Sequence, residues 1–230
     1  MRSWSRLLFG GVLLALGQTG CGSETEDPAA LATSPRSASP SPQSAAGPLV
    51  IFLGDSLTAG YGLREDQAFP ALWAEDFRGA GQEVRLVNAG ISGDTTAGGL
   101  ARIDWLLRQE PDVLVLELGA NDGLRGLSLD QTRANLDEII DRSLAAGARV
   151  LLLGMKIPPS YGADYSQAFE SLFVDLAESN DVALMPFLLA EIAADPEFNQ
   201  ADGIHPNAAG HERLAAAVAP YLEEILSDPG

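Results

Sequence analysis

The stretch LVIFLGDSLTAG, residues 49–60, decides the fold class, because a short apolar run stops abruptly in a small, polar turn. Residues 49–53 have the near-continuous apolar pattern that is typical of a strand buried on both faces of a sheet. Four similar runs follow along the chain, and longer segments with helical periodicity separate them. Alternating strands and helices indicate parallel β-α-β units with right-handed crossovers. The sequence therefore predicts an α/β domain built on a parallel sheet.

The apolar runs predict five strands, at residues 49–53, 84–88, 113–118, 150–155 and 182–186. Helical patterns predict five helices, at residues 67–78, 96–109, 129–146, 166–180 and 207–226. In open α/β sheets, ligands bind outside the carboxyl ends of the strands. We therefore expect functional side chains in the turns after the first three strands and in the late loops.

Composition excludes several classes of protein. The 230 residues carry 14 Lys+Arg against 32 Asp+Glu, a net charge of −18, and Lys156 is the single lysine, so nucleic acid is not an expected partner. One cysteine and two histidines cannot build a disulfide framework, a cysteine-rich zinc site or an iron–sulfur centre. We expect one domain that needs no metal and no other cofactor, and the sequence does not indicate an oligomeric state.

The amino terminus has the pattern of an export signal. Arg2 and Arg6 precede the apolar run at residues 7–17, which is too short to span a bilayer but fits the core of a signal peptide, here residues 1–20. Cys21, the only cysteine, follows at once and resembles the lipidated cysteine of bacterial lipoproteins, although Gln18 stands where that pattern usually has leucine. An ordinary signal peptide, cleaved further downstream near residues 30–32, is the alternative. Both interpretations predict an exported protein, periplasmic or at the cell surface.

Residues 21–47 are rich in Ser, Pro and Ala and show no hydrophobic periodicity, which predicts a tether without a core of its own. Residues 48–230 then form the folded domain. If Cys21 carries lipid, this tether joins the domain to a membrane surface, and that anchor is the only membrane contact that we expect.

Four separated segments carry residues suited to ester hydrolysis. Ser56 follows the first strand, Gly93 the second and Asn121 the third, and the segment DGIHP places Asp202 three residues before His205. A serine hydroxyl needs a base to accept its proton and a third group to orient that base, and Ser56, His205 and Asp202 are of the right types. A glycine amide and an asparagine side chain can donate to the oxyanion of a tetrahedral intermediate.

Each segment also has a simpler interpretation. Asp55 or Ser56 could be a helix N-cap, Gly93 a turn residue with positive φ, and Asn121 a loop-capping amide. Asp202 and His205 could be an acid and a surface histidine before a helix. The occurrence of all four segments in order, at the ends of the expected strands, favours the catalytic interpretation.

Together the segments GDSL, ISGDT, NDGLRG and DGIHPN resemble those of the SGNH/GDSL hydrolases, in particular the exported branch of multifunctional thioesterases/lysophospholipases and arylesterases. The resemblance covers most of residues 49–210, with Ala120 where the branch often has glycine. It implies a flavodoxin-like, three-layer α/β/α sandwich with a five-stranded parallel sheet. It also implies that Ser56 is the nucleophile of a triad with Asp202 and His205, and that the oxyanion hole comprises Ser56, Gly93 and Asn121.

The same resemblance implies that two loops flank the acyl chain of the substrate. Leu124 belongs to the loop after the oxyanion asparagine, and Ile157, Pro158 and Pro159 follow the fourth strand. Both loops could instead be ordinary turns.

Several other residues receive structural roles. His211 lies inside the last helical pattern and is expected to be structural or solvent-facing, while Asp55 and Asp94 orient loops beside the key residues. Trp73 and Trp105 lie in amphipathic patterns, which predicts that both pack in the core.

The leading hypothesis is a serine esterase that acts on small-molecule acyl esters, and by extension on thioesters or lysophospholipids, through an acyl-enzyme. A carbohydrate acetylesterase of the same superfamily is the alternative among enzymes. A surface lipoprotein that binds lipid or polysaccharide without catalysis is the alternative outside them.

Overall fold

Five parallel strands form the central sheet of the computed structural model, which describes residues 47–227. They are β1 (Leu49–Gly54), β2 (Arg85–Gly90), β3 (Val113–Glu117), β4 (Arg149–Leu153) and β5 (Ala183–Met185). Their order in the sheet is β2-β1-β3-β4-β5, and every neighbouring pair is parallel. The predicted signal peptide (residues 1–20), Cys21 and nearly all of the predicted tether lie outside the described residues.

Burial differs between the middle and the edges of the sheet. Residues of β1 and β3 are all buried, as continuous apolar runs predict. The prediction that all five strands are buried on both faces is wrong for β2 and β5, which are largely half-buried because each has a neighbouring strand on one side only.

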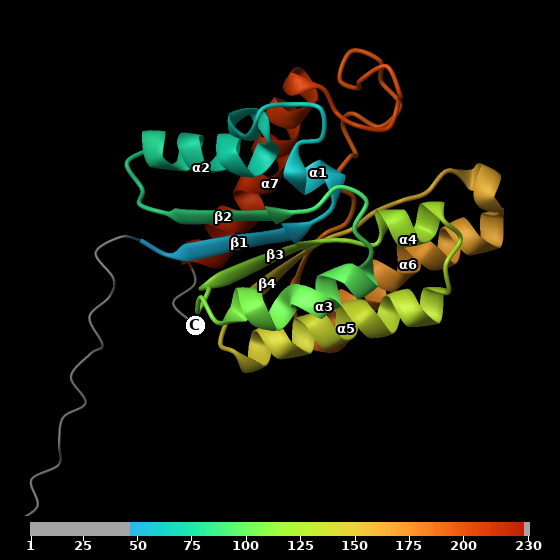
Figure 1. Ribbon diagram of the computed structural model, residues 1–230, viewed down its shortest axis with the longest axis horizontal. Coiled ribbons are helices and arrows are strands. Elements are labelled where there is room, and N and C mark those ends of the chain that lie inside the picture. Colours follow the sequence, from blue (N-terminus) through green and yellow to red (C-terminus); the bar gives the residue numbers. More distant parts are fainter. Residues whose placement is uncertain (1–46, 228–230) are drawn as a thin grey trace, which may run out of the picture. The chain divides into compact units, whose positions relative to one another are not determined.

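Helices cover both faces of the sheet, which confirms the three-layer α/β/α sandwich (Figure 1). Contacts join α2 to α7 on one face and join α3 to α5 and α5 to α6 on the other. The short helices α1 and α4 lie at the carboxyl ends of the strands (Figure 1). The bounds are α1 (Ser56–Ala59), η1 (Glu65–Gln67), α2 (Phe69–Gly79), α3 (Thr96–Leu107), α4 (Ala120–Leu124), α5 (Leu129–Ala145), η2 (Pro159–Tyr161), α6 (Ala163–Asn180) and α7 (Ala208–Ser227). None of the helices in this described part is long and apolar enough to span a bilayer.

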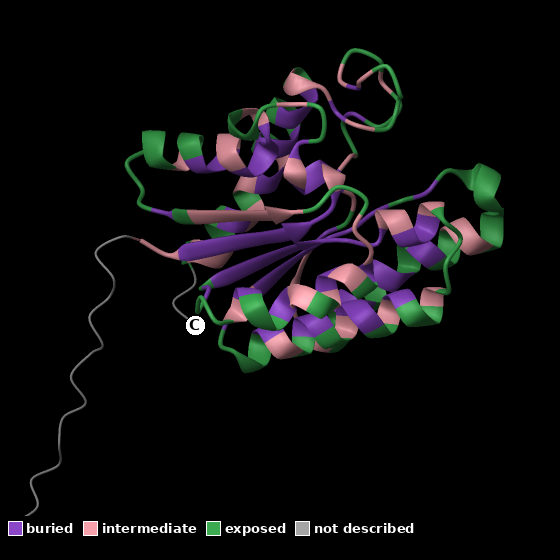
Figure 2. Ribbon diagram, in the orientation of Figure 1, coloured by how far each residue is buried: buried purple, intermediate pink, exposed green. Residues whose placement is uncertain are grey.

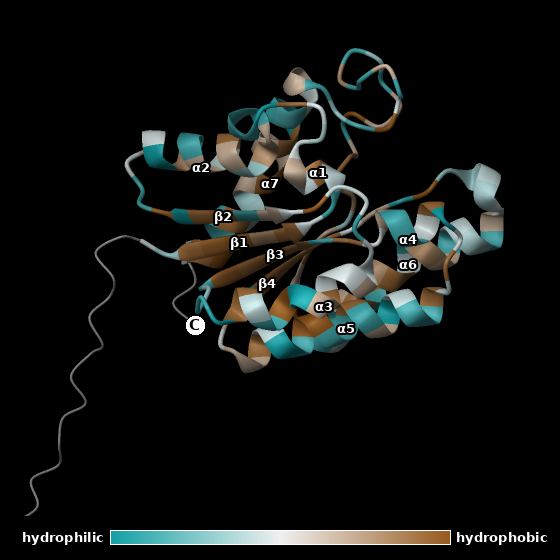
Figure 3. Cartoon of the chain, in the orientation of Figure 1, coloured by the Kyte–Doolittle hydropathy of each residue, from teal (hydrophilic) through white to brown (hydrophobic). Residues whose placement is uncertain are grey.

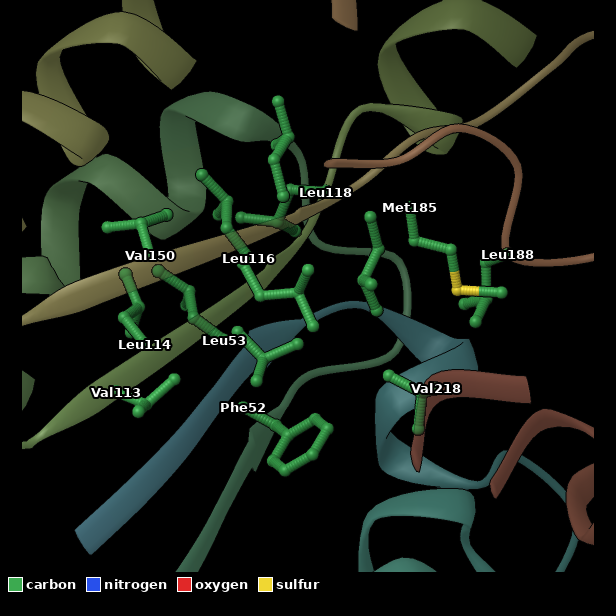
Figure 4. Close-up of a cluster of buried hydrophobic side chains, with 14 of the residues drawn as sticks. Phe52, Leu53, Val113, Leu114, Leu116, Leu118, Val150, Met185, Leu188 and Val218 are labelled. Atoms are coloured by element: carbon green, nitrogen blue, oxygen red, sulfur yellow. The ribbon is translucent and has the colours of Figure 1, made fainter. Parts of the chain in front are cut away.

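The core lies on both sides of the sheet, where Figure 2 shows β1, β3 and β4 buried between helices that carry buried and exposed residues in alternation. Figure 3 shows the matching hydropathy, with apolar strands and polar outer helix faces. Leucine and valine side chains of β3 pack around Leu53 in Figure 4.

The two tryptophans that were predicted to lie in the core differ in burial. Trp73 is buried against Phe52, as predicted, but Trp105 is 59% exposed. The prediction for Trp105 is wrong because Ile103 and Leu106 form the buried side of α3 and position 105 faces away from them.

Two glycines at the carboxyl ends of the strands allow α1 to lie directly against the sheet. A Cβ atom on Gly54 would lie 2.0 Å from the Thr58 hydroxyl oxygen, and one on Gly90 would lie 2.3 Å from the backbone nitrogen of Ala59. Asn88 of β2 also donates from Nδ2 to the carbonyl oxygen of Thr58 at 2.8 Å. These close approaches fix the position of the turn that carries Ser56.

Candidate active site

Ser56 is the first residue of α1, at the carboxyl end of β1. Asp55 is the N-cap of this helix, and its Oδ1 accepts a hydrogen bond from the Leu57 N–H at 3.0 Å. Asp55 is 1% exposed, whereas Ser56 is half-buried and lines a cleft. The turn therefore buries the Asp55 carboxylate and leaves the Ser56 hydroxyl at the cleft. This arrangement confirms the prediction that Asp55 orients the loop.

A hydrogen-bonded chain joins Ser56 to His205 and Asp202. His205 Nε2 lies 3.0 Å from Ser56 Oγ, and His205 Nδ1 lies 2.7 Å from Asp202 Oδ2. Asp202 Oδ1 accepts from the backbone N–H groups of His205 at 3.0 Å and Ile204 at 2.9 Å. These backbone bonds, together with the His205 ring, lower the pKa of Asp202 to about 2, so the carboxylate is ionised at neutral pH.

The loop that carries His205 is held by Gln200 and Tyr61. The Gln200 N–H donates to the His205 carbonyl at 2.7 Å, and Gln200 Nε2 donates to the carbonyls of Tyr61 at 2.7 Å and Pro206 at 2.9 Å. The Tyr61 ring lies against the His205 ring with centroids 4.6 Å apart. The imidazole is thus oriented by its backbone as well as by Asp202.

Asn121 lies in the first turn of α4 and reaches across to the turn of Ser56. Its Nδ2 donates to Asp55 Oδ2 at 2.9 Å, and the side chain lines the same cleft as Ser56. Gly93 has φ of 82°, a conformation that favours glycine, in the turn after β2. In the part of the chain that the structure describes, the Gly93 N–H donates to no protein acceptor.

A buried acid that the sequence did not single out lies beneath this turn. Glu117, at the end of β3, is fully buried, and its Oε2 accepts from the Asp55 N–H at 3.1 Å and the Thr58 hydroxyl at 2.7 Å. Burial, with the charge of Asp55 as a second cause, raises the pKa of Glu117 well above its usual range. The only sequence signal is one acid at the end of an otherwise apolar strand.

Two further polar clusters fix the loop that contains Gly93. Asp122 accepts from the Thr96 N–H at 2.9 Å and hydroxyl at 2.6 Å, which joins the start of α3 to α4. Asp94 pairs with Arg102, which also donates to the carbonyl oxygens of Ala89 and Gly54. Asp94 thus holds a loop, as predicted, whereas Asp122 and Arg102 were not anticipated.

The cleft has a volume of about 900 Å³ and combines the Ser56–His205 pair with an apolar wall. Leu124, Ile157, Pro158 and Pro159, which the sequence placed beside an acyl chain, all line it. Apolar residues not anticipated in this wall are Met155, Phe187 and Leu189. Among residues 47–227, no cluster of His, Cys, Asp or Glu side chains is suited to hold a metal ion.

His211 lies elsewhere, in α7, and is 1% exposed. Its Nδ1 accepts a hydrogen bond from the Phe69 N–H at 3.1 Å. Burial, with a smaller contribution from His205, lowers the pKa of His211 to about 4, so the ring is neutral at pH 7. Of the two roles expected for His211, structural or solvent-facing, the structure shows the structural one.

A hydroxyl, an imidazole and a carboxylate joined in this order, at the carboxyl edge of a parallel α/β sheet, are the arrangement of a serine hydrolase. The family model described as "GDSL-like Lipase/Acylhydrolase family" matches residues 52–213. The chain belongs to this family, and it is an acylhydrolase.

The chain is similar to an esterase, TesA, of Pseudomonas aeruginosa, with 43% identity over 80% of this chain and 92% of that protein. It is 39% identical to the thioesterase 1/protease 1/lysophospholipase L1 of Escherichia coli K12, over 80% of this chain and 88% of the relative. Among solved structures, the psychrotrophic esterase EstA from a Pseudoalteromonas species, inhibited by monoethylphosphonate, aligns with a TM-score of 0.76 and 35% identity, over 79% of this chain and all of that one. These similarities agree with the predicted fold and family.

Proposed function

We propose that Ser56, His205 and Asp202 are the catalytic triad of this acylhydrolase. The observation that carries the proposal is the pair of contacts, at 3.0 Å and 2.7 Å, that joins the three side chains beside a cleft lined by Ser56 and His205. His205 Nε2 accepts the Ser56 proton as Oγ attacks the acyl carbonyl carbon, and the ionised Asp202 stabilises the resulting imidazolium. His205 then protonates the leaving alcohol or thiol as its bond to the acyl carbon breaks.

The second half of the reaction regenerates the enzyme. Water enters the site and gives a proton to His205 while its oxygen attacks the acyl-Ser56 ester. Collapse of the intermediate returns the proton to Ser56 Oγ and releases the carboxylic acid. No other group needs to gain or lose a proton, so the triad accounts for every proton transfer of the cycle.

The oxyanion formed in both steps requires hydrogen-bond donors. The backbone N–H groups of Ser56 and Gly93 and the Nδ2 of Asn121 are our candidates. The free Gly93 N–H and the position of Asn121 beside Ser56 in the cleft support this assignment.

We propose acyl esters and thioesters as substrates, with the acyl chain against Leu124, Ile157 and Pro158. The apolar wall of the cleft supports this choice over a carbohydrate acetylesterase, whose acetyl group leaves such a surface largely uncovered. Relatives named as an arylesterase and as a thioesterase/lysophospholipase agree with it. We further propose that the enzyme is exported and anchored through a lipid on Cys21, with residues 21–47 as the tether.

Replacement of Ser56 by alanine tests the triad. We expect Ser56→Ala to lose ester hydrolysis and labelling by a p-nitrophenyl phosphonate, with an unchanged unfolding curve, because only the nucleophilic oxygen is removed. Ser179→Ala, which removes a hydroxyl from the outer part of α6, is the control and retains both. Turnover that persists in Ser56→Ala, or a label found on another residue, contradicts the proposal.

A further inference from the structure

Arg125 joins two segments of the proposed oxyanion site that are far apart in the sequence. It follows α4 directly, and its Nη2 donates to the carbonyl oxygen of Gly93 at 2.9 Å and to Asn121 Oδ1 at 3.2 Å. One guanidinium nitrogen therefore contacts both of the residues that we assign to the oxyanion hole in addition to Ser56. No ion-pair partner of Arg125 occurs between residues 47 and 227.

The contact with Asn121 determines which way its amide points. An ionised carboxylate can only accept hydrogen bonds and a guanidinium can only donate them. Asp55 therefore requires the Nδ2 of Asn121 on its side, and Arg125 requires Oδ1 on the other. Because both partners exclude the flipped amide, one N–H of Nδ2 is committed to Asp55 and the second remains for a ligand in the cleft.

The contact with Gly93 restricts a backbone that is otherwise unusually free. Glycine has no Cβ, so it occupies a wide range of φ and ψ, and here φ is 82°. A hydrogen bond from Arg125 to the Gly93 carbonyl limits rotation of the peptide plane that follows the N–H donor. Together with the hydrogen bond from the Asp94 N–H to the Ile91 carbonyl at 3.0 Å, this contact restricts the turn in which the Gly93 N–H lies, in keeping with electrostatic preorganisation.

We infer that Arg125 is a positioning residue that preorganises the oxyanion hole through Gly93 and Asn121. This inference rests on the proposed function, because it assumes that these two residues donate to the oxyanion. Arg125 itself touches neither Ser56 nor His205 among its hydrogen bonds, so its effect is transmitted through the two donors. Its positive charge also favours negative charge that develops nearby.

The test compares Arg125→Ala with Asn121→Ala and with Arg142→Ala, the control. Arg142 lies on α5, pairs with Asp104 and Glu138, and belongs to neither the cleft nor the oxyanion site. We expect Arg125→Ala to lower kcat by roughly 10- to 100-fold with KM within about twofold, less than the roughly 100- to 1,000-fold of a lost direct donor. Arg125→Lys keeps the charge but has a single donor nitrogen, so its kcat is expected to lie between those of wild type and Arg125→Ala.

Chemical rescue separates positioning from a merely structural role. Guanidinium ion at tens of millimolar should raise the activity of Arg125→Ala several-fold, because the position left by the side chain is exposed to solvent. It should leave the activity of Arg142→Ala unchanged. The double variant Arg125→Ala/Asn121→Ala should lose less activity than the product of the two single losses, because part of the effect of Arg125 acts through Asn121.

The outcomes distinguish the inference from the proposed function. If Asn121→Ala keeps wild-type kcat, the oxyanion assignment itself is wrong. If Asn121→Ala loses kcat while Arg125→Ala stays within threefold of wild type, the oxyanion hole stands and the inference about Arg125 is overturned. A loss in Arg125→Ala that guanidinium does not relieve, accompanied by a shifted unfolding curve, also overturns it.

Discussion

At the scale of single residues, two buried carboxyl groups in and beneath the turn of Ser56 hold one proton between them. Glu117 is fully buried and lies next to the buried carboxyl of Asp55. Burial raises the pKa of both carboxyls, and Asp55 accepts hydrogen bonds from Leu57 and Asn121 that favour its ionised form. Two adjacent buried carboxyls cannot both be ionised at low cost, so we assign the proton to Glu117 and the charge to Asp55.

Replacement of Glu117 by glutamine tests this assignment, because the amide mimics a protonated acid. The native pKa of Glu117 is raised, so wild type takes up a proton on folding above pH 4 to 5, and its stability falls as pH rises. Glu117→Gln does not take up that proton. Urea unfolding at pH 4.5 and 7.5 should show the variant gaining stability relative to wild type at the higher pH. The exposed Glu191→Gln is the control, and an identical pH dependence in Glu117→Gln and wild type would refute the assignment.

At the scale of elements, the junction of β1, β2 and α1 positions the active site through close backbone contacts. We expect Gly90→Ala to lower the free energy of unfolding by about 1–3 kcal/mol, because its Cβ would lie 2.3 Å from a backbone nitrogen that cannot move independently. Gly79→Ala is the matched control, since a Cβ there meets nothing within 4 Å at the end of α2. It should be neutral or stabilising by about 0.4–1 kcal/mol. If Gly90→Ala and Gly79→Ala changed the free energy of unfolding by the same amount in urea, the junction would tolerate displacement of α1 by the added methyl group.

The elements also show how far the sequence could predict the structure. Long apolar runs place β1 and β3, and a 3.6-residue period places α5, because each signal extends over enough residues. The four residues of α1 are too few for any period, and its position depends on contacts with Gly90 and Glu117 that are remote in sequence. Motifs identified the residues of the proposed triad, whereas the contacts of Arg125 and Glu117 are tertiary and no local pattern indicates them.

The loops after β3 and β4 form the proposed acyl wall, and a substrate series tests it. Each added methylene should contribute up to about 0.8 kcal/mol, or about fourfold in kcat/KM, until the wall ends. We expect kcat/KM to rise from p-nitrophenyl acetate towards decanoate, and Ile157→Ala to flatten the rise. Val174→Ala, on the exposed side of α6, should leave the series unchanged. A flat series in wild type, or one that Ile157→Ala does not alter, would remove these loops from the acyl site.

At the scale of the whole molecule, the net charge of −18 produces a field that repels anions. Lys156, the only lysine, lines the cleft, but it pairs with Glu170 at 2.6 Å and lies over the Phe187 ring at 5.5 Å from its centroid. The Glu170 carboxylate offsets the charge of Lys156, so Lys156 offers an anionic substrate little attraction to counter the overall repulsion.

Added salt should therefore affect charged and neutral substrates differently. Between 20 and 200 mM NaCl, the Debye length shortens from about 20 Å to about 7 Å, which screens the repulsion. We expect kcat/KM for a fatty acyl-coenzyme A, a polyanionic thioester, to rise several-fold over this range. A neutral p-nitrophenyl ester of the same acyl chain is the control and should change by less than about twofold. If salt instead lowers kcat/KM for the thioester, local cations such as Lys156 attract the substrate more strongly than the whole molecule repels it.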